Sequence, residues 1–228
     1  MADLTDWAGC PALSHAPMQG RFVRLEPLAP SHAAGLFAAF DGFDANWAYL
    51  PYGPLDRAGW ADWVPWAAAL PDTLFFALCD PADGTPRGVA SYLRITPAQG
   101  VAEVGHLNFA PGLQASPAAT EAMALMMARV FAAGYRRYEW KCNAANLASR
   151  RAAQRLGFSY EGTFRQHMVV KGANRDTAWF SVLDRDWPPL SQSFSAWLDP
   201  SNFDVDGRQI KALSAMTAPL LAARDPVI

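Results

Sequence analysis

A run of small residues at positions 114–120, QASPAAT, has the composition of an anion site. It follows an alternating segment that is typical of a strand, and it opens a segment with helical periodicity. A helix N-terminus offers up to four unpaired N–H groups and the positive end of the helix dipole, and small side chains let a ligand reach them. The pattern therefore favours a phosphate or carboxylate site. Capping of the helix by Ser116 would explain the same residues.

A second group of polar and basic residues lies at 146–158, NLASRRAAQRLGF. Asn146 and Ser149 are three residues apart at the start of an expected helix, so they share one face. The region 129–185 holds eleven Lys and Arg and four acidic residues, which gives it a charge of +7 and leaves −9 for the rest of the chain. A small anionic ligand, such as a phosphorylated cofactor, fits this asymmetry. A solvated, arginine-rich face is the alternative.

Composition excludes several other classes of protein. The chain has 228 residues, 51% of them hydrophobic, and a net charge of −2, so neither nucleic acid nor an anionic membrane is an expected partner. Cys10, Cys79 and Cys142 form no CxxC pair, which predicts neither a metal site nor a disulfide framework. The first twenty residues lack a signal peptide pattern, and no apolar run reaches the ~18 residues of a membrane span. We therefore expect a cytoplasmic protein.

The elements that position the two polar groups follow from periodicity and turn residues. We expect helices at 31–40, 60–69, 116–133 and 146–156, the second of them interrupted by Pro65. We expect strands at 21–27, 74–79, 88–96, 102–109, 138–142, 164–171 and 177–184. Residues 41–59 read as a loop. This order predicts a mixed α/β fold.

Three parts of the chain are expected to differ in organisation. Residues 1–20 read as an N-terminal arm, residues 21–187 as the main domain, and residues 188–228 as a C-terminal extension with a Pro-rich link and an amphipathic helical tail. The nine tryptophans, together with Trp197, Leu198 and Phe203 of the tail, are more apolar surface than a small domain readily hides. We therefore expect a homodimer. Packing of the tail on its own domain is the alternative.

Two motifs resemble the GNAT superfamily of acyl-CoA N-acyltransferases, most closely its ribosomal-protein N-terminal acetyltransferase branch. One is Glu103-Val104-Gly105 followed by Gln114, Pro117 and Ala119 at the positions of a Q/R-x-x-G-x-G/A motif, and the other is Asn146, Ser149, Gly157 and Phe158. The resemblance covers about residues 20–187. It implies a mixed, mostly antiparallel sheet flanked by helices, with splayed central strands that form a slot for acetyl-CoA. The main domain would then be an N-acetyltransferase domain.

The resemblance also implies which residues bind acetyl-CoA, and it calls for no metal. These are Leu107, Phe109, Gln114, Ala115, Ser116, Ala118, Ala119, Thr120, Asn146 and Ser149. Pro117 stands where the family usually has its first glycine, and it removes one backbone donor from the pyrophosphate site. Losing one such hydrogen bond costs about 0.5–1.5 kcal/mol, so the departure affects affinity more than fold.

Catalysis in the resembled family needs a base for the amine and a proton donor for the departing thiolate. We expect Glu103 as the base, with His106 and His167 as rivals, and Ser149 as the donor. In a regular strand, Glu103, Gly105, Leu107 and Phe109 share one face, and Val104, His106 and Asn108 share the other. Glu103 and His106 would then line the slot together only if a bulge intervened. Cys142 as an acyl-enzyme nucleophile would need an activating histidine, and none is predictable beside it.

The acceptor pocket is implied by the same resemblance to lie around residues 41–66. Trp47, Tyr49 and Tyr52 are its expected substrate contacts, in a segment that also holds Trp60, Trp63 and Trp66. Core packing or a dimer contact would use the same aromatic residues. The expected function is acetyl transfer from acetyl-CoA to a primary amine, either a protein N-terminus or a small amine, by direct attack in a ternary complex. A catalytically silent acyl-CoA-binding sensor is the alternative.

Overall fold

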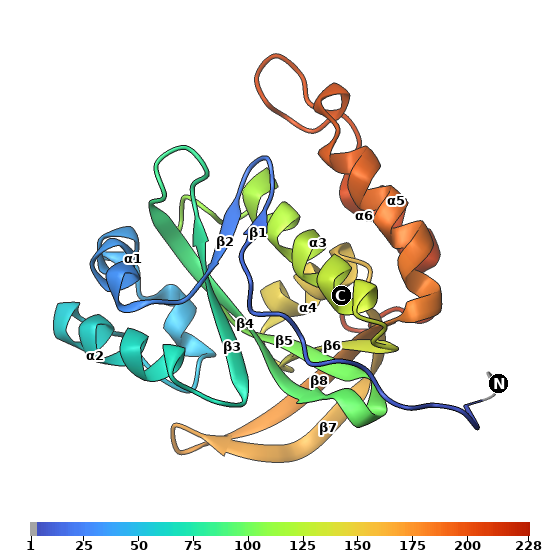
Figure 1. The fold of residues 1–228 in the computed structure, drawn as a ribbon, viewed down its shortest axis with the longest axis horizontal. Coiled ribbons are helices and arrows are strands. Elements are labelled where there is room, and N and C mark those ends of the chain that lie inside the picture. Colours follow the sequence, from blue (N-terminus) through green and yellow to red (C-terminus); the bar gives the residue numbers. More distant parts are fainter. Residues whose placement is uncertain (1–3) are drawn as a thin grey trace.

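An eight-stranded, mostly antiparallel sheet organises residues 4–228, the part of the chain that the computed structural model describes (Figure 1). The strands are β1 (Met18–Gln19), β2 (Arg24–Pro27), β3 (Thr73–Cys79), β4 (Pro86–Thr96), β5 (Val101–Phe109), β6 (Arg137–Asn143), β7 (Ser159–Val170) and β8 (Ala173–Leu183). Their order in the sheet is β1-β2-β3-β4-β5-β6-β8-β7, and only β5 and β6 are parallel. The expected mixed α/β fold is confirmed.

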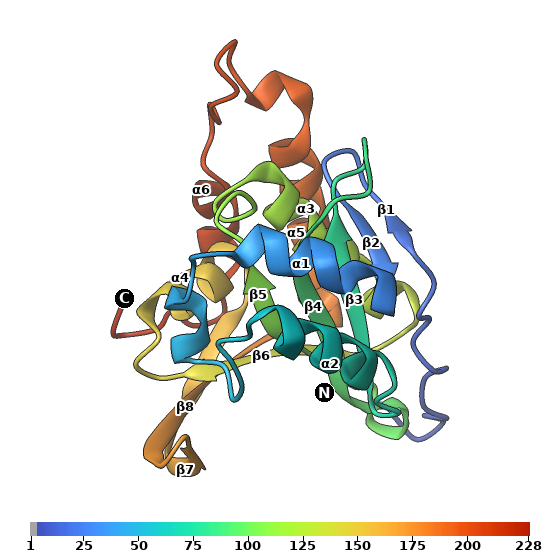
Figure 2. The ribbon, with the colours of Figure 1, turned by 90° about the vertical axis from the view of Figure 1, so that its left-hand side faces the viewer.

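Helices cover both faces of the sheet (Figures 1 and 2). They are α1 (Ala33–Phe40), α2 (Arg57–Ala68), α3 (Pro117–Ala132), α4 (Leu147–Arg155), α5 (Trp187–Leu198) and α6 (Leu213–Thr217). Two hydrophobic cores result. Phe76 belongs to the core beneath α3, α4 and α5, whereas its neighbour Phe75 belongs to the core beneath α1 and α2. Adjacent strand residues point to opposite faces, which explains why β3 is apolar from Leu74 to Cys79.

The central strands β5 and β6 part after a short pairing. Val101–Val104 of β5 pair with Arg137–Trp140 of β6, and beyond this point neither strand has the other as a partner. The backbone edge of β5 that faces β6 therefore has no strand partner from Gly105 to Phe109. The splayed central strands expected from the sequence are present in the fold.

Two expectations about local structure were wrong, and both concern proline. Pro65 lies inside α2 without interrupting it, and Asp56 caps the start of this helix by accepting from Gly59 N at 2.7 Å. Pro188 and Pro189 were expected in a link, but they occupy the first turn of α5. The first turn tolerates proline because its N–H groups have no partner inside the helix.

The expected arm and tail both pack on the main domain. Arg129 of α3 donates to the carbonyl oxygens of Ser14 and Pro17 at 3.1 and 2.8 Å, while residues 1–3 of the arm lie outside the described part. Trp197 is 3% exposed and belongs to the core beneath α3. The tail therefore buries Trp197 within its own chain, whereas Val205 and Ile210 are exposed, and the homodimer stays a prediction.

A buried ion pair ties the end of the chain to α4. Arg150 Nε donates to Asp225 Oδ2 at 2.6 Å, and the two side chains are 5% and 0% exposed. Arg150 Nη1 also donates to Ala144 O at 2.8 Å. Two buried charges are stable only as a pair, because removal of one leaves the other without compensation.

We expect Asp225→Asn to lower the free energy of unfolding by about 3–5 kcal/mol, because the Arg150 charge stays buried without a counter-charge. Urea unfolding measures this change. Asp206→Asn is the matched control, since Asp206 and its partner Arg208 are 63% and 78% exposed and such a pair contributes about 0–1 kcal/mol. Equal stabilities for the two variants would contradict the prediction.

Candidate active site

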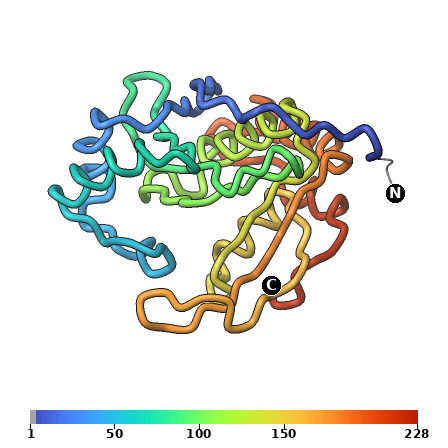
Figure 3. Tube along the Cα trace, turned by 60° about the horizontal axis from the view of Figure 1, so that its bottom comes forward, coloured from blue at the N-terminus to red at the C-terminus, as the bar shows by residue number. Residues whose placement is uncertain are grey.

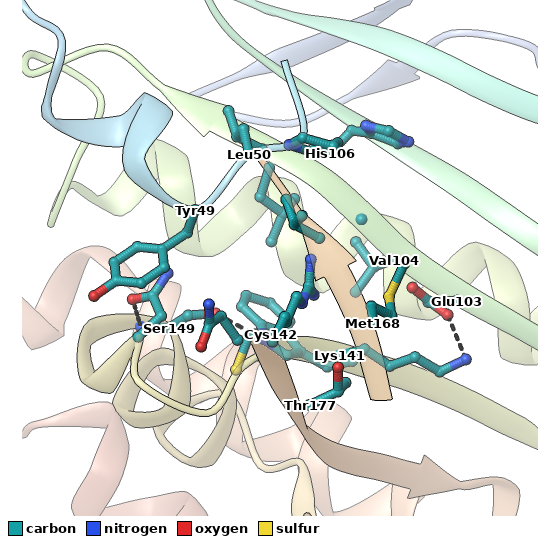
Figure 4. A pocket seen from close by; sticks show the side chains of 18 of the residues that line it. Tyr49, Leu50, Glu103, Val104, His106, Lys141, Cys142, Ser149, Met168 and Thr177 are labelled. Carbon is teal, nitrogen blue, oxygen red and sulfur yellow. Dashed lines mark hydrogen bonds and ion pairs between the residues drawn. The ribbon is translucent and has the colours of Figure 1, made fainter. Parts of the chain in front are cut away.

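A cavity of about 420 Å³ lies where β5 and β6 separate (Figure 4). Its walls come from β4, β5, β6, the β7–β8 hairpin, the start of α4 and the segment around Tyr49. The hairpin reaches toward that segment (Figure 3), and Lys171 Nζ donates to Trp47 O at 2.9 Å. The cavity thus lies between parts of the chain that are far apart in sequence.

A β-bulge at His106 shapes one wall of the cavity. His106 has a φ of +52°, and the pairing with β4 shifts register there, so that one β4 residue stands opposite two β5 residues. A bulge adds one residue to a strand and reverses the alternation of side chains beyond it. Val104, Leu107 and Phe109 consequently all pack in the core beneath α3.

The expected alternation along 102–109 was therefore wrong beyond Gly105. Leu107 and Phe109 do not share the face of Glu103, and His106 does. Glu103, Gly105 and His106 line the cavity together, in the arrangement that required a bulge. The positive φ of His106 therefore brings the side chains of Glu103 and His106 to the same side of β5.

Glu103 is a fixed carboxylate in the cavity wall. Its side chain is 4% exposed, Oε1 lies 2.7 Å from Arg94 Nη1, and Oε2 lies 2.7 Å from Lys141 Nζ. Burial raises the pKa of Glu103, and the nearby Lys141 and Arg94 oppose this shift without cancelling it. Lys141 also lies 3.1 Å from Glu139 Oε2, so one ammonium joins carboxylates from two strands.

His106 is a neutral side chain at physiological pH. Burial, with a smaller contribution from Arg94, lowers its pKa from 6.5 to about 4. Its ring stacks on Tyr52 with 5.7 Å between ring centroids, and Nδ1 lies 3.2 Å from the Tyr52 hydroxyl. The other candidate, His167, also lines the cavity, with Nδ1 2.9 Å from Thr177 Oγ1.

The opposite wall carries Trp140, Cys142, Asn146 and Ser149. Ser149 Oγ accepts from Trp140 Nε1 at 3.0 Å, which leaves its own hydrogen to donate. Burial raises the pKa of Cys142, and a hydrogen bond with Ser149 opposes this shift; the charges that act on the thiol come from Arg150, Arg175 and Asp225 rather than from a histidine. Cys142 therefore lacks the environment of a nucleophile.

The start of α3 presents free backbone donors. Ser116 Oγ accepts from Ala119 N at 3.1 Å, and Thr120 N donates to Ser116 O. In the described part of the chain, no acceptor pairs with the N–H groups of Ala115, Ser116 and Ala118. Gln114 faces elsewhere, because its side chain donates to Phe109 O at 2.8 Å. Small residues and three free N–H groups thus make a cradle for an anion.

The three expected acceptor contacts lie in different places. Tyr49 lines the cavity, is 40% exposed and donates to Ala145 O at 3.3 Å. Trp47 is 3% exposed and packs against Phe40 and Trp60 in the core beneath α1 and α2. Tyr52 lies behind His106. The expectation for Trp47 and Tyr52 is corrected accordingly: the structure gives these two rings packing roles behind the wall.

Three cations and a tryptophan of the cavity wall were not expected from the sequence. Arg94, Lys141, Arg175 and Trp179 all line the cavity. Trp179 falls within the expected strand 177–184, but Arg175 falls in the turn expected before it, and the structure places both on β8. Their approach to Lys141 was not predictable either, because it depends on the register of β6 against β8, which places Lys141 opposite Trp179.

Comparisons with known proteins identify the family. Residues 23–159 match the family model of the acetyltransferase (GNAT) domain. A GCN5-related N-acetyltransferase from Brucella melitensis is 48% identical with a TM-score of 0.91, over 94% of this chain and 100% of that one. A probable GNAT acetyltransferase from Chromobacterium violaceum ATCC 12472 is 41% identical with a TM-score of 0.77, over 82% and 96%. A search of curated proteins gives no match.

This chain belongs to the GNAT acetyltransferase family, whose members transfer an acyl group from acetyl-CoA. The microcin C7 self-immunity acetyltransferase MccE, solved with acetyl-CoA and AMP, is 18% identical over 72% of this chain and 93% of its own, with a TM-score of 0.64. At that identity it shows the fold alone. The ribosomal-protein branch stays a prediction.

In the described part of the chain, no helix is long and apolar enough to cross a membrane.

We expect His106→Gln to flatten the pH dependence of stability between pH 6.5 and 4. In this range the unfolded chain protonates His106 and the folded chain does not, so the free energy of unfolding falls as the pH falls. The contribution reaches roughly 3 kcal/mol by pH 4. Urea unfolding at several pH values measures it. An unchanged slope in the variant would contradict a buried, neutral His106.

Proposed function

We propose that the protein transfers an acetyl group from acetyl-CoA to a primary amine by direct attack in a ternary complex. The observation that carries the proposal is the cavity between β5 and β6, which has Glu103 on one wall and Ser149 on the other. A thioester between these walls would have a proton acceptor on one side and a proton donor on the other. A cytoplasmic enzyme without a metal is part of the proposal.

The residues around the slot fit the chemical groups of acetyl-CoA. The free N–H groups of Ala115, Ser116 and Ala118 suit a pyrophosphate, because they combine donors with a helix dipole. The edge of β5 from Gly105 to Phe109 has no strand partner and offers backbone groups to the amides of the pantetheine arm, apart from Phe109 O, which already accepts from Gln114 and Asn46. Asn146 Oδ1 accepts from Ser149 N at 3.0 Å, which leaves its NH₂ group to donate.

Two side chains have assigned roles in the chemistry. Glu103 takes a proton from the amine as the nitrogen attacks the acetyl carbon, so that a C–N bond forms and the C–S bond breaks. Ser149 donates a hydrogen bond to the sulfur that leaves with the electron pair of the C–S bond. Holding the amine against the thioester supplies much of the remaining rate enhancement. The raised pKa of Glu103 makes its carboxylate more basic than an exposed one.

The alternative function, a silent acyl-CoA-binding sensor, has two specific features in its favour. Pro117 removes a donor from the anion cradle, and Arg94 and Lys141 both hold the proposed base. A sensor would bind acetyl-CoA without turnover. Release of CoA in the presence of an amine panel separates the two functions.

Acetyl-CoA should stabilise the protein in proportion to RT ln(1 + [L]/Kd), which thermal shift measures. Asn146→Ala should weaken binding by about 1–3 kcal/mol, because it removes a donor to the pantetheine amides. Asn146→Asp is the matched variant, since it keeps the acceptor that caps α4 and lacks the NH₂ group, and it should weaken binding as well. An unchanged melting temperature at millimolar acetyl-CoA would contradict the proposed function.

Glu103→Gln should lower the rate of acetyl transfer by ~10²–10⁴, the usual contribution of a positioned base. The amide keeps the shape of the side chain and cannot take the proton, so acetyl-CoA binding should persist. Steady-state rates and calorimetry measure the two quantities. His106→Gln should change the rate less than about tenfold, given its lowered pKa. The reverse order of effects would assign the base to His106.

A further inference from the structure

Positive charge exceeds negative charge in the cavity wall. Its lining residues include Arg94, Lys141 and Arg175 and a single carboxylate, Glu103. Arg94 and Lys141 are ion-paired with that carboxylate. Arg175 has no ion-pair partner in the described part of the chain. One guanidinium of the site is therefore without a counter-charge.

Arg175 lies in a group of unsatisfied donors. Its Nε–H is buried and has no acceptor, and the same holds for Nε1–H of Trp179. The two residues are four apart on β8, so they share one face of the strand, and both line the cavity. Native proteins rarely leave buried donors unpaired, so unpaired donors in the wall of a cavity suit a water, an ion or a ligand group as their partner. An oxygen-rich group at Arg175 would supply the missing acceptors.

These donors lie away from the proposed pyrophosphate site at the start of α3. Trp140 and Cys142 of β6 pack in the core on the side of α3, so Lys141 between them points to the opposite face of the sheet. Lys141 Nζ lies 3.7 Å from the centroid of the Trp179 ring, which places the cationic group on that opposite face. Gln114–Thr120, at the start of α3, contribute nothing to the cavity lining. An anion at Arg175 would therefore arrive with the acceptor.

We propose that the acceptor is a small amine that carries a carboxylate or a phosphate, and that Arg175 binds this anionic group. The inference deepens the proposed acetyl transfer and rests on it. A guanidinium binds either anion through two parallel N–H···O bonds, so it fixes orientation as well as charge. Leu50, Met168 and Val170 also line the cavity and suit an apolar body. The anionic group and the apolar contacts together would aim the amine at Glu103.

Matched acceptors test the inference. Amino acids with different side chains are compared with their α-amides, and phosphoethanolamine with ethanolamine, as kcat/KM for CoA release from acetyl-CoA. Each pair shares the amine and differs in the anionic group. We expect kcat/KM for at least one anionic series to exceed that of its neutral counterpart by about 10- to 100-fold, the range for a hydrogen bond to a charged group. The stronger series distinguishes carboxylate from phosphate. Equal rates within every pair would overturn the inference and leave acetyl transfer intact.

Binding without turnover keeps the inference testable if no amine reacts. Calorimetry in the presence of CoA compares N-acetyl amino acids with their amides, and N-acetyl phosphoethanolamine with N-acetylethanolamine. Preferential binding of an anionic product without any turnover would support the anion site and contradict the proposed enzyme. No preference for any anionic product would overturn the inference itself.

Variants of Arg175 assign the preference to this side chain. Arg175→Met should reduce the ratio of anionic to neutral kcat/KM toward one, and Arg175→Lys should restore part of it because the charge returns without the two-pronged geometry. Arg165→Met is the matched control, since Arg165 lies exposed on the same hairpin and outside the cavity wall. A ratio within one variant does not depend on how much of the protein folds. An unchanged ratio in Arg175→Met would overturn the assignment.

Discussion

The short parallel pairing of β5 with β6 is the constraint on which the site depends. The two strands share hydrogen bonds from Val101 to Val104 and then separate. The β5 bulge at His106 follows this point directly, and a bulge bends its strand and increases the local twist. The pairing aligns the two walls, and the separation opens the space between them. A longer pairing would close the cavity, and a shorter one would leave Glu103 without the neighbouring strand that supplies Lys141.

Charged side chains on one face of the sheet make the pairing of β5 with β6 possible. Glu103 and Glu139 stand opposite each other in the register of β5 and β6, and like charges in that position repel. Lys141 lies within 3.1 Å of both carboxylates, and Arg137 Nε donates to Glu139 Oε1 at 2.8 Å. The cations therefore offset the repulsion that the register creates. Glu103 is buried and oriented because the fold itself needs this network, which fixes the carboxylate before any substrate enters.

The sequence determined the elements of the site more reliably than their relative placement. Helix starts at Ser116 and Asn146 follow from local capping, and both side chains cap their helices as local chemistry requires. The bulge at His106 is a property of how β5 pairs with β4, and no residue type in the segment demands it. The position of Trp47 could not be predicted either, because only tertiary packing decides whether an aromatic ring lines a pocket or fills the core behind it. Local rules predict elements, and pairing decides which side chains meet.

The C-terminal tail supports one wall of the cavity, although it is far from that wall in sequence. Arg150 follows Ser149 on the first turn of α4, and its guanidinium binds both Asp225 and the Ala144 carbonyl. The tail therefore fixes the turn that carries Asn146 and Ser149, although it lies outside the residues matched by the family model. On the other wall, β8 positions Arg175 and Trp179. One wall thus depends on Asp225, near the end of the chain, and the other on the register of β8 against β6, so distant parts of the chain together build the cavity.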